Sequence, residues 1–338
     1  MLTQGESIMH DHACDRVFAV TAPTHLIVPF AQVLSAFGQD DWQRWGPNDL
    51  PHLRRLLRAM QPGPVDGADE MSWTPPHERV LARAYGWPTD DGIFPWAAQE
   101  IALKGWGDPS KPWGRITPVH WQLGTEQVRM APPESLQLDD GSSNTLFEAV
   151  RDLFESEGFD LRYADPLTWL ASHPSLADLP CASLDRVSGR SVEPWMRQDP
   201  QSRLLRRLQN EVQMLLYRHP LNEAREAQGL LPINSFWLSA TGRLRGPVQA
   251  LRHDILVADD LREPALNEDA LAWQAAWQRL DAEILATWLA RCDQGEDLQL
   301  TLCGERGAQT WRQLPLTWTQ RVARWWRGSN DLRWVEDL

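Results

Sequence analysis

The stretch RLQNEVQMLLYRHPLNEAREAQGLLPINSFWLSATGRL (Arg207–Leu244) predicts a long helix, a short helix and a buried strand in direct succession. Leucine and valine recur at i, i+3 and i+4 over residues 204–216, which is the pattern of an amphipathic helix. Residues 222–228 predict the second helix, and Gly229 suits its end. The apolar run over residues 231–238 predicts a buried strand. Helices that alternate with buried strands are typical of an α/β protein.

The rest of the chain continues this alternation. We expect strands at residues 25–31 and 159–164, two strands around a Gly-Thr-Glu turn within 119–131, and a strand at 297–304. Helices are expected at residues 49–60, 77–86, 142–158, 267–292 (with Asn267 as N-cap) and 316–328. Residues 61–76, rich in Pro, Gly and Asp, predict a loop, and the Trp-rich residues 87–113 predict an irregular segment. The predicted fold class is therefore α/β, with a mixed sheet flanked by helices.

Length and composition bound the organisation of the chain. Its 338 residues are 42% hydrophobic and 23% charged, which is typical of a globular protein. Residues 1–16 are interpreted as a flexible N-terminal tail. Residues 17–338 then form an α/β domain, either alone or with a smaller α+β subdomain around 114–200.

Charge and motif content exclude several function classes. The net charge of −13 opposes nucleic-acid binding, and the four cysteines show no zinc-ligand spacing. No apolar run is long enough to cross a membrane, and the N-terminus lacks the pattern of a signal peptide. We therefore expect a cytoplasmic protein with reduced thiols, without a predicted cofactor, metal site, nucleic-acid partner or membrane association.

The opening stretch carries most of the candidate ligand-binding residues. One face of its long helix presents polar side chains, and others follow on the short helix, on the strand and beyond it. Hydroxyls, amides and guanidinium groups at a strand end are typical of an anion site. The alternative interpretation is structural: these side chains cap helices and tie the strand to its neighbours. The candidates are Asn210, Gln213, His219, Asn222, Arg225, Asn234, Ser235, Ser239, Thr241 and Arg243.

A second candidate lies in CASLDRVSGRSVEPW (Cys181–Trp195). Ser183, Asp185 and Arg186 surround a Ser-Gly turn that could hold a phosphate or a carboxylate, or that could be a solvated loop. Histidine supplies candidate acid–base groups at His219 and His120, and His77 also lies beside proline. A lone histidine can equally serve as a structural hydrogen-bonding group.

Four stretches, PVHW, ASLDRVSGR, RRLQNEVQMLLYRHPLNEAREAQG and INSFWLSATG, resemble the RpfE-type regulatory proteins of proteobacteria, which are often labelled phosphoglycerate mutase-like. The resemblance spans about His25 to Trp326. It implies a regulatory protein and a remote likeness to archaeal-type cofactor-independent phosphoglycerate mutases, which have an alkaline-phosphatase-like fold.

The residues that match the mutase pattern are His219, Asn222, Arg225, Asn234 and Trp237. Its Trp-Gly-x-Gly part is replaced by residues 239–242. No Asp follows HLIVPFA, and no Asp-plus-His set surrounds LQLTLCG, so the two-metal machinery of those enzymes is expected to be absent. The resemblance therefore implies a degenerate form of that fold that retains an anion pocket.

These observations favour a regulatory or binding protein with a pocket for a small anionic or phosphorylated ligand. A protein partner is also possible. The first alternative is a phosphoester enzyme of the phosphoglycerate mutase-like kind, with His219 or His120 as acid–base group and with Arg225 and Arg186 holding phosphate. The second is a protein–protein interaction protein that presents some of the 19 tryptophans to its partner.

Overall fold

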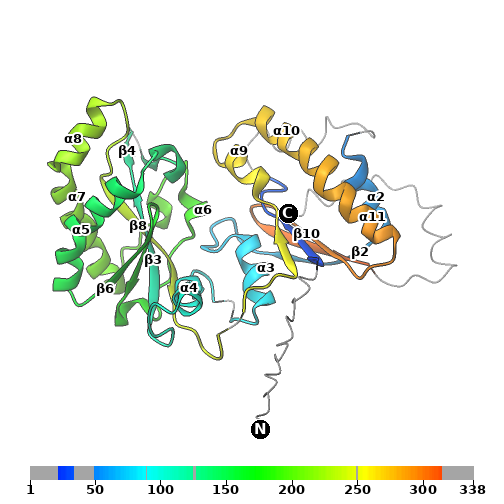
Figure 1. The fold of residues 1–338 in the computed structure, drawn as a ribbon, viewed down its shortest axis with the longest axis horizontal. Coiled ribbons are helices and arrows are strands. Elements are labelled where there is room, and N and C mark those ends of the chain that lie inside the picture. The colour runs from blue at the N-terminus through cyan, green and yellow to red at the C-terminus, as the bar shows by residue number, and fades with distance from the viewer. Residues whose placement is uncertain (1–21, 34–48, 89, 125–126, 249, 314–338) are drawn as a thin grey trace, which may run out of the picture.

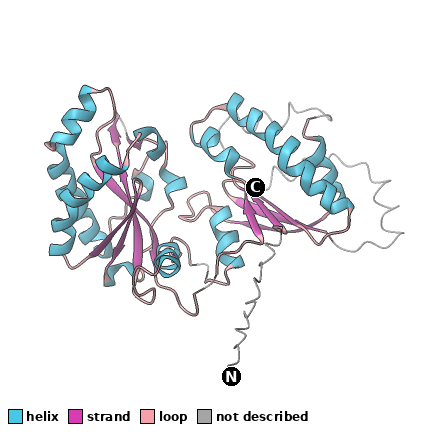
Figure 2. Ribbon diagram, in the orientation of Figure 1, coloured by secondary structure: helices cyan, strands magenta, loops and turns pink. Residues whose placement is uncertain are grey.

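A computed structural model describes residues 22–33, 49–88, 90–124, 127–248 and 250–313. The chain forms two lobes that lie side by side, each with a sheet covered by helices (Figures 1 and 2). The five-stranded lobe contains both ends of the described chain, and the four-stranded lobe contains the middle, residues 96–242. The predicted tail 1–16 and the predicted helix 316–328 lie outside the described residues.

The sheet of the five-stranded lobe is mixed. Its strands are β1 (His25–Val28), β2 (Gln61–Gly67), β9 (Ile255–Val257), β10 (Gln299–Cys303) and β11 (Gly307–Arg312), in the order β2-β11-β10-β1-β9. Strand β1 pairs in parallel with both β9 and β10, whereas β11 is antiparallel to β10 and to β2. The predicted fold class, a mixed sheet flanked by helices, is confirmed.

Helices cover both faces of this sheet. One face packs against α2 (Pro51–Ala59), α10 (Ala270–Leu280) and α11 (Ala286–Asp293), and Trp273, Trp277 and Trp288 fill the core between them. The opposite face, which includes Ile27, packs against α3 (Pro76–Ala84). Alternate residues of β1 therefore serve different cores, as the two-residue period of a strand requires.

A buried carboxylate joins α2 to the other helices of its face. Helices α10 and α11 are linked by a π-helical segment, Asp281–Leu285, and Asp281 points at the N-terminus of α2. Its Oδ1 accepts a hydrogen bond from the Leu53 N–H at 2.7 Å, and its Oδ2 accepts from the His52 N–H at 3.2 Å and lies 2.9 Å from His52 Nδ1. Helix α2 has no side-chain cap of its own, so Asp281 caps it from a distant part of the chain.

The sheet of the four-stranded lobe is antiparallel, in the order β6-β7-β3-β8. The strands are β3 (Trp113–Val119), β6 (Asp160–Asp165), β7 (Thr168–Ser172) and β8 (Ser235–Gly242). One face packs on α5 (Asp140–Ser156) and α7 (Arg203–Tyr217), and the other on α4 (Trp96–Lys104). The two remaining strands, β4 (Trp121–Leu123) and β5 (Val128–Met130), form a hairpin. The remaining α-helices are the short α6 (Leu184–Val187), α8 (Pro220–Ala227) and α9 (Arg262–Leu266). Helix α9 belongs to the five-stranded lobe.

Three predicted element assignments are wrong. Residues 61–67 form β2 instead of a loop, because β2 is an edge strand on which Pro62 and Pro64 are tolerated. Residues 96–104 form α4, whose buried residues include Ala97 and Gln99, so the helix shows no clear amphipathic period. The N-cap of α10 is Asp269 instead of Asn267, because the Asp269 side chain accepts a hydrogen bond from the Ala272 N–H. Strands β3, β7, β9 and β11 were not predicted. Within the described ranges, none of the helices combines the length and the apolar character that crossing a bilayer requires.

His25 is expected to make the protein less stable in acid. Its Nε2 lies 2.7 Å from the Thr301 hydroxyl, and burial, together with the charge of Arg312, lowers its pKa to about 4. Because the unfolded chain takes up this proton near pH 6.5, the stability that neutral His25 gives is present above that pH. It is lost as the pH falls toward 4, by on the order of 2 kcal/mol.

Urea unfolding of the wild type and of His25→Asn, at pH 7 and at pH 4, measures this contribution. The variant should lose less stability between the two pH values than the wild type does. His253→Asn, which replaces an exposed histidine, should behave as the wild type. Equal pH dependence in His25→Asn and in the wild type would contradict the assignment.

Candidate functional site

Three short helices from the two lobes begin next to one another. Helix α3 starts with Pro76, so His77 and Glu78 lie in its first turn. Helix α6 starts after Ser183, whose hydroxyl accepts a hydrogen bond from the Asp185 N–H, and α9 starts at Arg262. The Ser183 N–H also donates to the Trp73 carbonyl at 3.0 Å, which holds α6 beside the segment that leads into α3. The sequence thus places charged side chains in the first turns of neighbouring helices.

Asp185 is the centre of a buried ion-pair network. Its Oδ2 lies 3.1 Å from His77 Nε2, and its Oδ1 accepts from Arg262 Nε at 2.7 Å and Nη2 at 2.6 Å. Arg262 also pairs with Glu134, with 2.8 Å between Arg262 Nη1 and Glu134 Oε1, so Glu134 is part of the network. Burial alone would raise the pKa of Asp185, but the hydrogen bond to His77 and the charge of Arg262 hold it well below its usual range. Asp185 is therefore ionised.

Glu78 behaves in the opposite way. Burial raises the pKa of its carboxyl group, and the neighbouring Asp185 raises it further, although His77 partly opposes both effects. The Ser183 hydroxyl donates a short hydrogen bond to Glu78 Oε1. Two carboxyl groups in one site thus differ in their tendency to ionise, and such a difference is common where a protein binds ligands or moves protons.

A cavity of about 240 Å³ lies against this network, between the two lobes. Its volume suits a small ligand, since pockets for drug-sized molecules start at about 300 Å³. The backbone at its wall is unusual. Ala240 has a positive φ of 56°, and it lies where the pairing of β8 with β3 is interrupted by a bulge. Bulges and left-handed residues other than glycine are enriched at binding sites. The polar residues of the wall are Glu78, Arg115, Ser183, Asp185, Ser239 and Arg262.

Two hydrogen-bond donors in the cavity wall have no acceptor among the described residues. Arg115 Nη2 donates to Glu100 at 3.0 Å, but the Nε–H of Arg115 is buried without a partner. The indole N–H of Trp96, another residue of the wall, is also buried without a partner. Buried donors normally find an acceptor. Arg115 and Trp96 therefore suit a ligand that brings acceptor atoms into this region.

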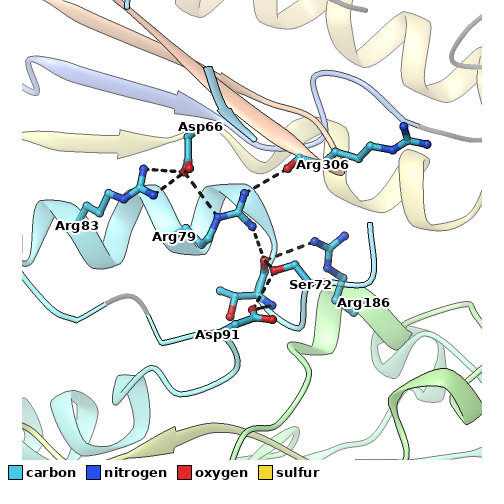
Figure 3. Close-up of polar contacts among 8 residues, drawn as sticks. Asp66, Ser72, Arg79, Arg83, Asp91, Arg186 and Arg306 are labelled. Atoms are coloured by element: carbon cyan, nitrogen blue, oxygen red, sulfur yellow. Dashed lines mark hydrogen bonds and ion pairs between the residues drawn. The ribbon is translucent and has the colours of Figure 1, made fainter. Parts of the chain in front are cut away.

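Arg79 and Arg186 donate hydrogen bonds to backbone carbonyls at the junction of the two lobes (Figure 3). The Thr74 carbonyl accepts from Arg79 Nη1 at 2.7 Å and from Arg186 Nη2 at 3.4 Å. Arg186 Nη1 also donates to the Glu305 carbonyl at 2.9 Å, in the turn between β10 and β11, and Arg79 Nη2 donates to the Arg306 carbonyl at 3.2 Å. Burial lowers the pKa of Arg186 to about 10, which leaves it charged at neutral pH. Arg186, expected to bind a ligand, thus reaches from α6 of the four-stranded lobe to two backbone carbonyls of the five-stranded lobe.

The structure brings together three of the predicted site residues. Ser183 and Asp185 line the cavity, and so does Ser239, which comes from the opening stretch of the sequence. The helices α7 and α8, which carry the other candidates of that stretch before the strand, lie on the outer side of the four-stranded lobe (Figure 1). The two groups of predicted residues therefore do not form one site.

Most of the other candidate side chains form hydrogen bonds with backbone groups. Asn222 bonds the Leu216 and Ile233 carbonyls and the Ile233 N–H. Arg225 donates to the Leu231 and Leu136 carbonyls, and Asn234 bonds both the N–H and the carbonyl of Trp121. Thr241 donates to the Leu179 carbonyl, the ring of His120 lies 2.7 Å from the Pro232 carbonyl, and His219 caps α8.

The last four candidates have no such bond. Asn210 is exposed and Gln213 is half-buried on α7, Ser235 is buried in β8 with its hydroxyl unpartnered, and exposed Arg243 lines a separate small hollow.

Sequence reasoning missed Glu78, Arg115 and Arg262 as site residues, and it treated His77 only as a lone histidine. The adjacent His77 and Glu78 at a predicted helix start were the one local signal. Nothing in the spacing of positions 78, 115, 185 and 262 relates them, because their proximity depends on how the two lobes meet.

Comparison with known proteins gives only distant likenesses. No protein-family model matches the chain, and no curated protein matches it. A solved structure of the PH0037 protein from Pyrococcus horikoshii is 9% identical, with a TM-score of 0.42 over 86% of this chain and 87% of that one. A cofactor-independent phosphoglycerate mutase from Thermoplasma acidophilum is 13% identical, with a TM-score of 0.35 over 86% of this chain and 89% of that one. Likeness at this level is remote, and it assigns neither a family nor an activity to this chain.

Proposed function

We propose that the protein binds a small anionic ligand, a carboxylate or a phosphate ester, in the cavity between the two lobes. The observation that carries this proposal is the convergence of Arg115, Arg262 and two serine hydroxyls on one cavity. A regulatory role for such binding is what the resemblance of the sequence to RpfE-type proteins implies.

On the Arg115 side of the cavity, the charges favour an anion. Glu100 is shared between Arg115 at 3.0 Å and Lys104 Nζ at 2.8 Å, so this trio has one excess positive charge. The raised pKa of Glu78 favours its neutral form, which can donate a hydrogen bond. The charge of Asp185 is paired with that of Arg262. Arg115 is thus the wall residue best able to pair with an incoming carboxylate or phosphate.

Calorimetric titration of the full chain with phosphorylated and carboxylated metabolites, and with neutral analogues, tests the proposal. At least one anionic compound should bind while its neutral analogue does not. Arg115→Ala should weaken that binding by about 10- to 100-fold, because it removes a charge-assisted contact. The control is Arg162→Ala on β6, which replaces an exposed arginine and should leave the affinity unchanged. Retained affinity in Arg115→Ala, or no binding by any compound, would overturn the proposal.

A phosphoester enzyme is the second candidate. The specific observation in its favour is the hydrogen bond between Ser183 and Glu78, since both line the cavity. A carboxyl with a raised pKa can serve as a general acid. If the wild type turns over such an ester, Glu78→Gln, which keeps the shape of the side chain but removes the acid, should reduce the turnover while ligand affinity stays near that of the wild type.

A further inference from the structure

Three side chains beside the cavity have the composition of a metal site. His77, Glu78 and Asp185 each offer one donor atom, and these atoms lie within 4.8 Å of one another. The closest pair is His77 Nε2 and Asp185 Oδ2, at 3.1 Å. Ligands about 2.0–2.2 Å from a shared zinc ion lie roughly 3–3.5 Å apart, so small rotations of these side chains would complete the set. One imidazole and two carboxylates suit a divalent transition-metal ion, whose binding would displace the proton that burial favours on Glu78.

The surroundings hold these donors in place. Arg262 occupies Oδ1 of Asp185 and leaves Oδ2 to face His77. Ser183 likewise occupies Oε1 of Glu78 and leaves its other oxygen free of that bond. The His77 ring packs against Phe30, with 5.6 Å between ring centroids. Outer hydrogen bonds of this kind orient the ligands of protein metal sites.

The charge balance and the position of the cluster favour a cation. Besides Glu78 and Asp185, Glu134 contacts Arg262, and Asp259 interacts electrostatically with both His77 and Asp185. Asp185, Glu134 and Asp259 thus all interact with one guanidinium group, that of Arg262. Glu78 and Asp185 also line the cavity of about 240 Å³, so an ion held by them would keep a coordination position open to a ligand.

We propose that His77, Glu78 and Asp185 bind one divalent transition-metal ion at the wall of the cavity. The sequence alone predicted no metal site. This inference goes beyond anion binding and does not depend on it, although an ion at this place would face the same ligand that Arg115 is proposed to contact.

The test uses the full chain, freed of metal with a chelator and titrated with Co²⁺ and Zn²⁺. We expect one ion per chain by calorimetry, together with visible absorption of protein-bound Co²⁺. His77→Ala should weaken Zn²⁺ binding by at least about 100-fold, because loss of a direct ligand should exceed the 10- to 100-fold cost of losing an outer-shell partner. Glu78→Gln, which keeps the shape of the side chain, should weaken it by at least about 10-fold.

Control variants separate this site from others. The double variant His10→Ala/His12→Ala tests the two histidines near the N-terminus, and it should keep wild-type affinity and the Co²⁺ spectrum. Circular dichroism establishes that His77→Ala and Glu78→Gln are folded. Wild-type protein that binds no metal, or metal binding that survives His77→Ala and Glu78→Gln and is lost in the double variant, would overturn the inference.

Arg115→Ala distinguishes the two proposals. It should leave Zn²⁺ affinity within about twofold of the wild type, because Arg115 is not a ligand of the ion, while anion binding is lost. Metal binding without any anion binding would remove the proposed function and leave the metal site in place. Anion binding without metal binding would overturn the metal site and leave the proposed function in place.

Discussion

Asp281→Ala should lower the free energy of unfolding by about 3 kcal/mol, because it leaves buried N–H groups without an acceptor. The carboxylate is only 3% exposed and accepts from the backbone N–H groups of His52 and Leu53. These donors belong to the N-terminus of α2, which has no side-chain cap of its own. Asp281 is also a negative charge at the positive end of that helix, which adds to its effect.

Urea unfolding at pH 7 measures this change. Asp281→Asn should fall between the wild type and the alanine variant, since asparagine keeps one acceptor oxygen and can cap a helix. The matched control is Asp293→Ala at the end of α11. Asp293 also contacts α2, through Arg55, but the two side chains are 58% and 61% exposed. The control should lose no more than about 0.5 kcal/mol. A loss below about 1 kcal/mol in Asp281→Ala would contradict the capping role.

Asn222→Ala should also lower the free energy of unfolding by about 3 kcal/mol. The Asn222 amide donates to the Leu216 carbonyl at 2.9 Å and to the Ile233 carbonyl at 2.7 Å, and it accepts from the Ile233 N–H at 2.8 Å. It thereby joins the end of α7 to the segment that leads into β8. Alanine would leave the N–H and the carbonyl of Ile233 buried and unpaired, whereas the Leu216 carbonyl would keep its hydrogen bond from the His219 N–H.

Asn222→Asp tests the direction of these bonds. A carboxylate can still accept from Ile233, but it would face two carbonyl oxygens, so this variant should be at least as unstable as Asn222→Ala. The control is Asn210→Ala on the exposed face of α7, which should stay within about 0.5 kcal/mol of the wild type. If Asn222→Ala unfolds as the wild type does in urea but loses anion binding, Asn222 is a ligand residue and its structural role is wrong.

The sequence predicted the elements whose local pattern agrees with their packing. Helices α5 and α7 bury one regular face and were identified by their periodicity, and β1 was identified as a short apolar run. It failed at β2, where prolines lie on an edge strand, and at α4, where the buried residues follow no clear helical period. In these two cases tertiary position overrides the local pattern.

The candidate site was predictable only in part. Ser183, Asp185 and Ser239 were identified because hydroxyl and acidic side chains follow helix and strand boundaries there. Arg115 and Arg262 were not, because each reaches the cavity from a different lobe and has no local motif. Asn222 and Arg225 have the side chains of a ligand site, but the structure uses their donors on backbone carbonyls. Residue type alone does not distinguish these two uses.

The pairing of β1 has a consequence for how the chain folds as it is made. Strand β1 lies near the start of the chain, but both of its partners, β9 and β10, come from the last third. The four-stranded sheet, in contrast, draws every strand from residues 113–242. On the ribosome this second sheet can close first, while the apolar residues Leu26–Val28 remain unpaired until β9 and β10 have been synthesised. Strand β1 is therefore synthesised well before its sheet partners and is among the last strands to pair.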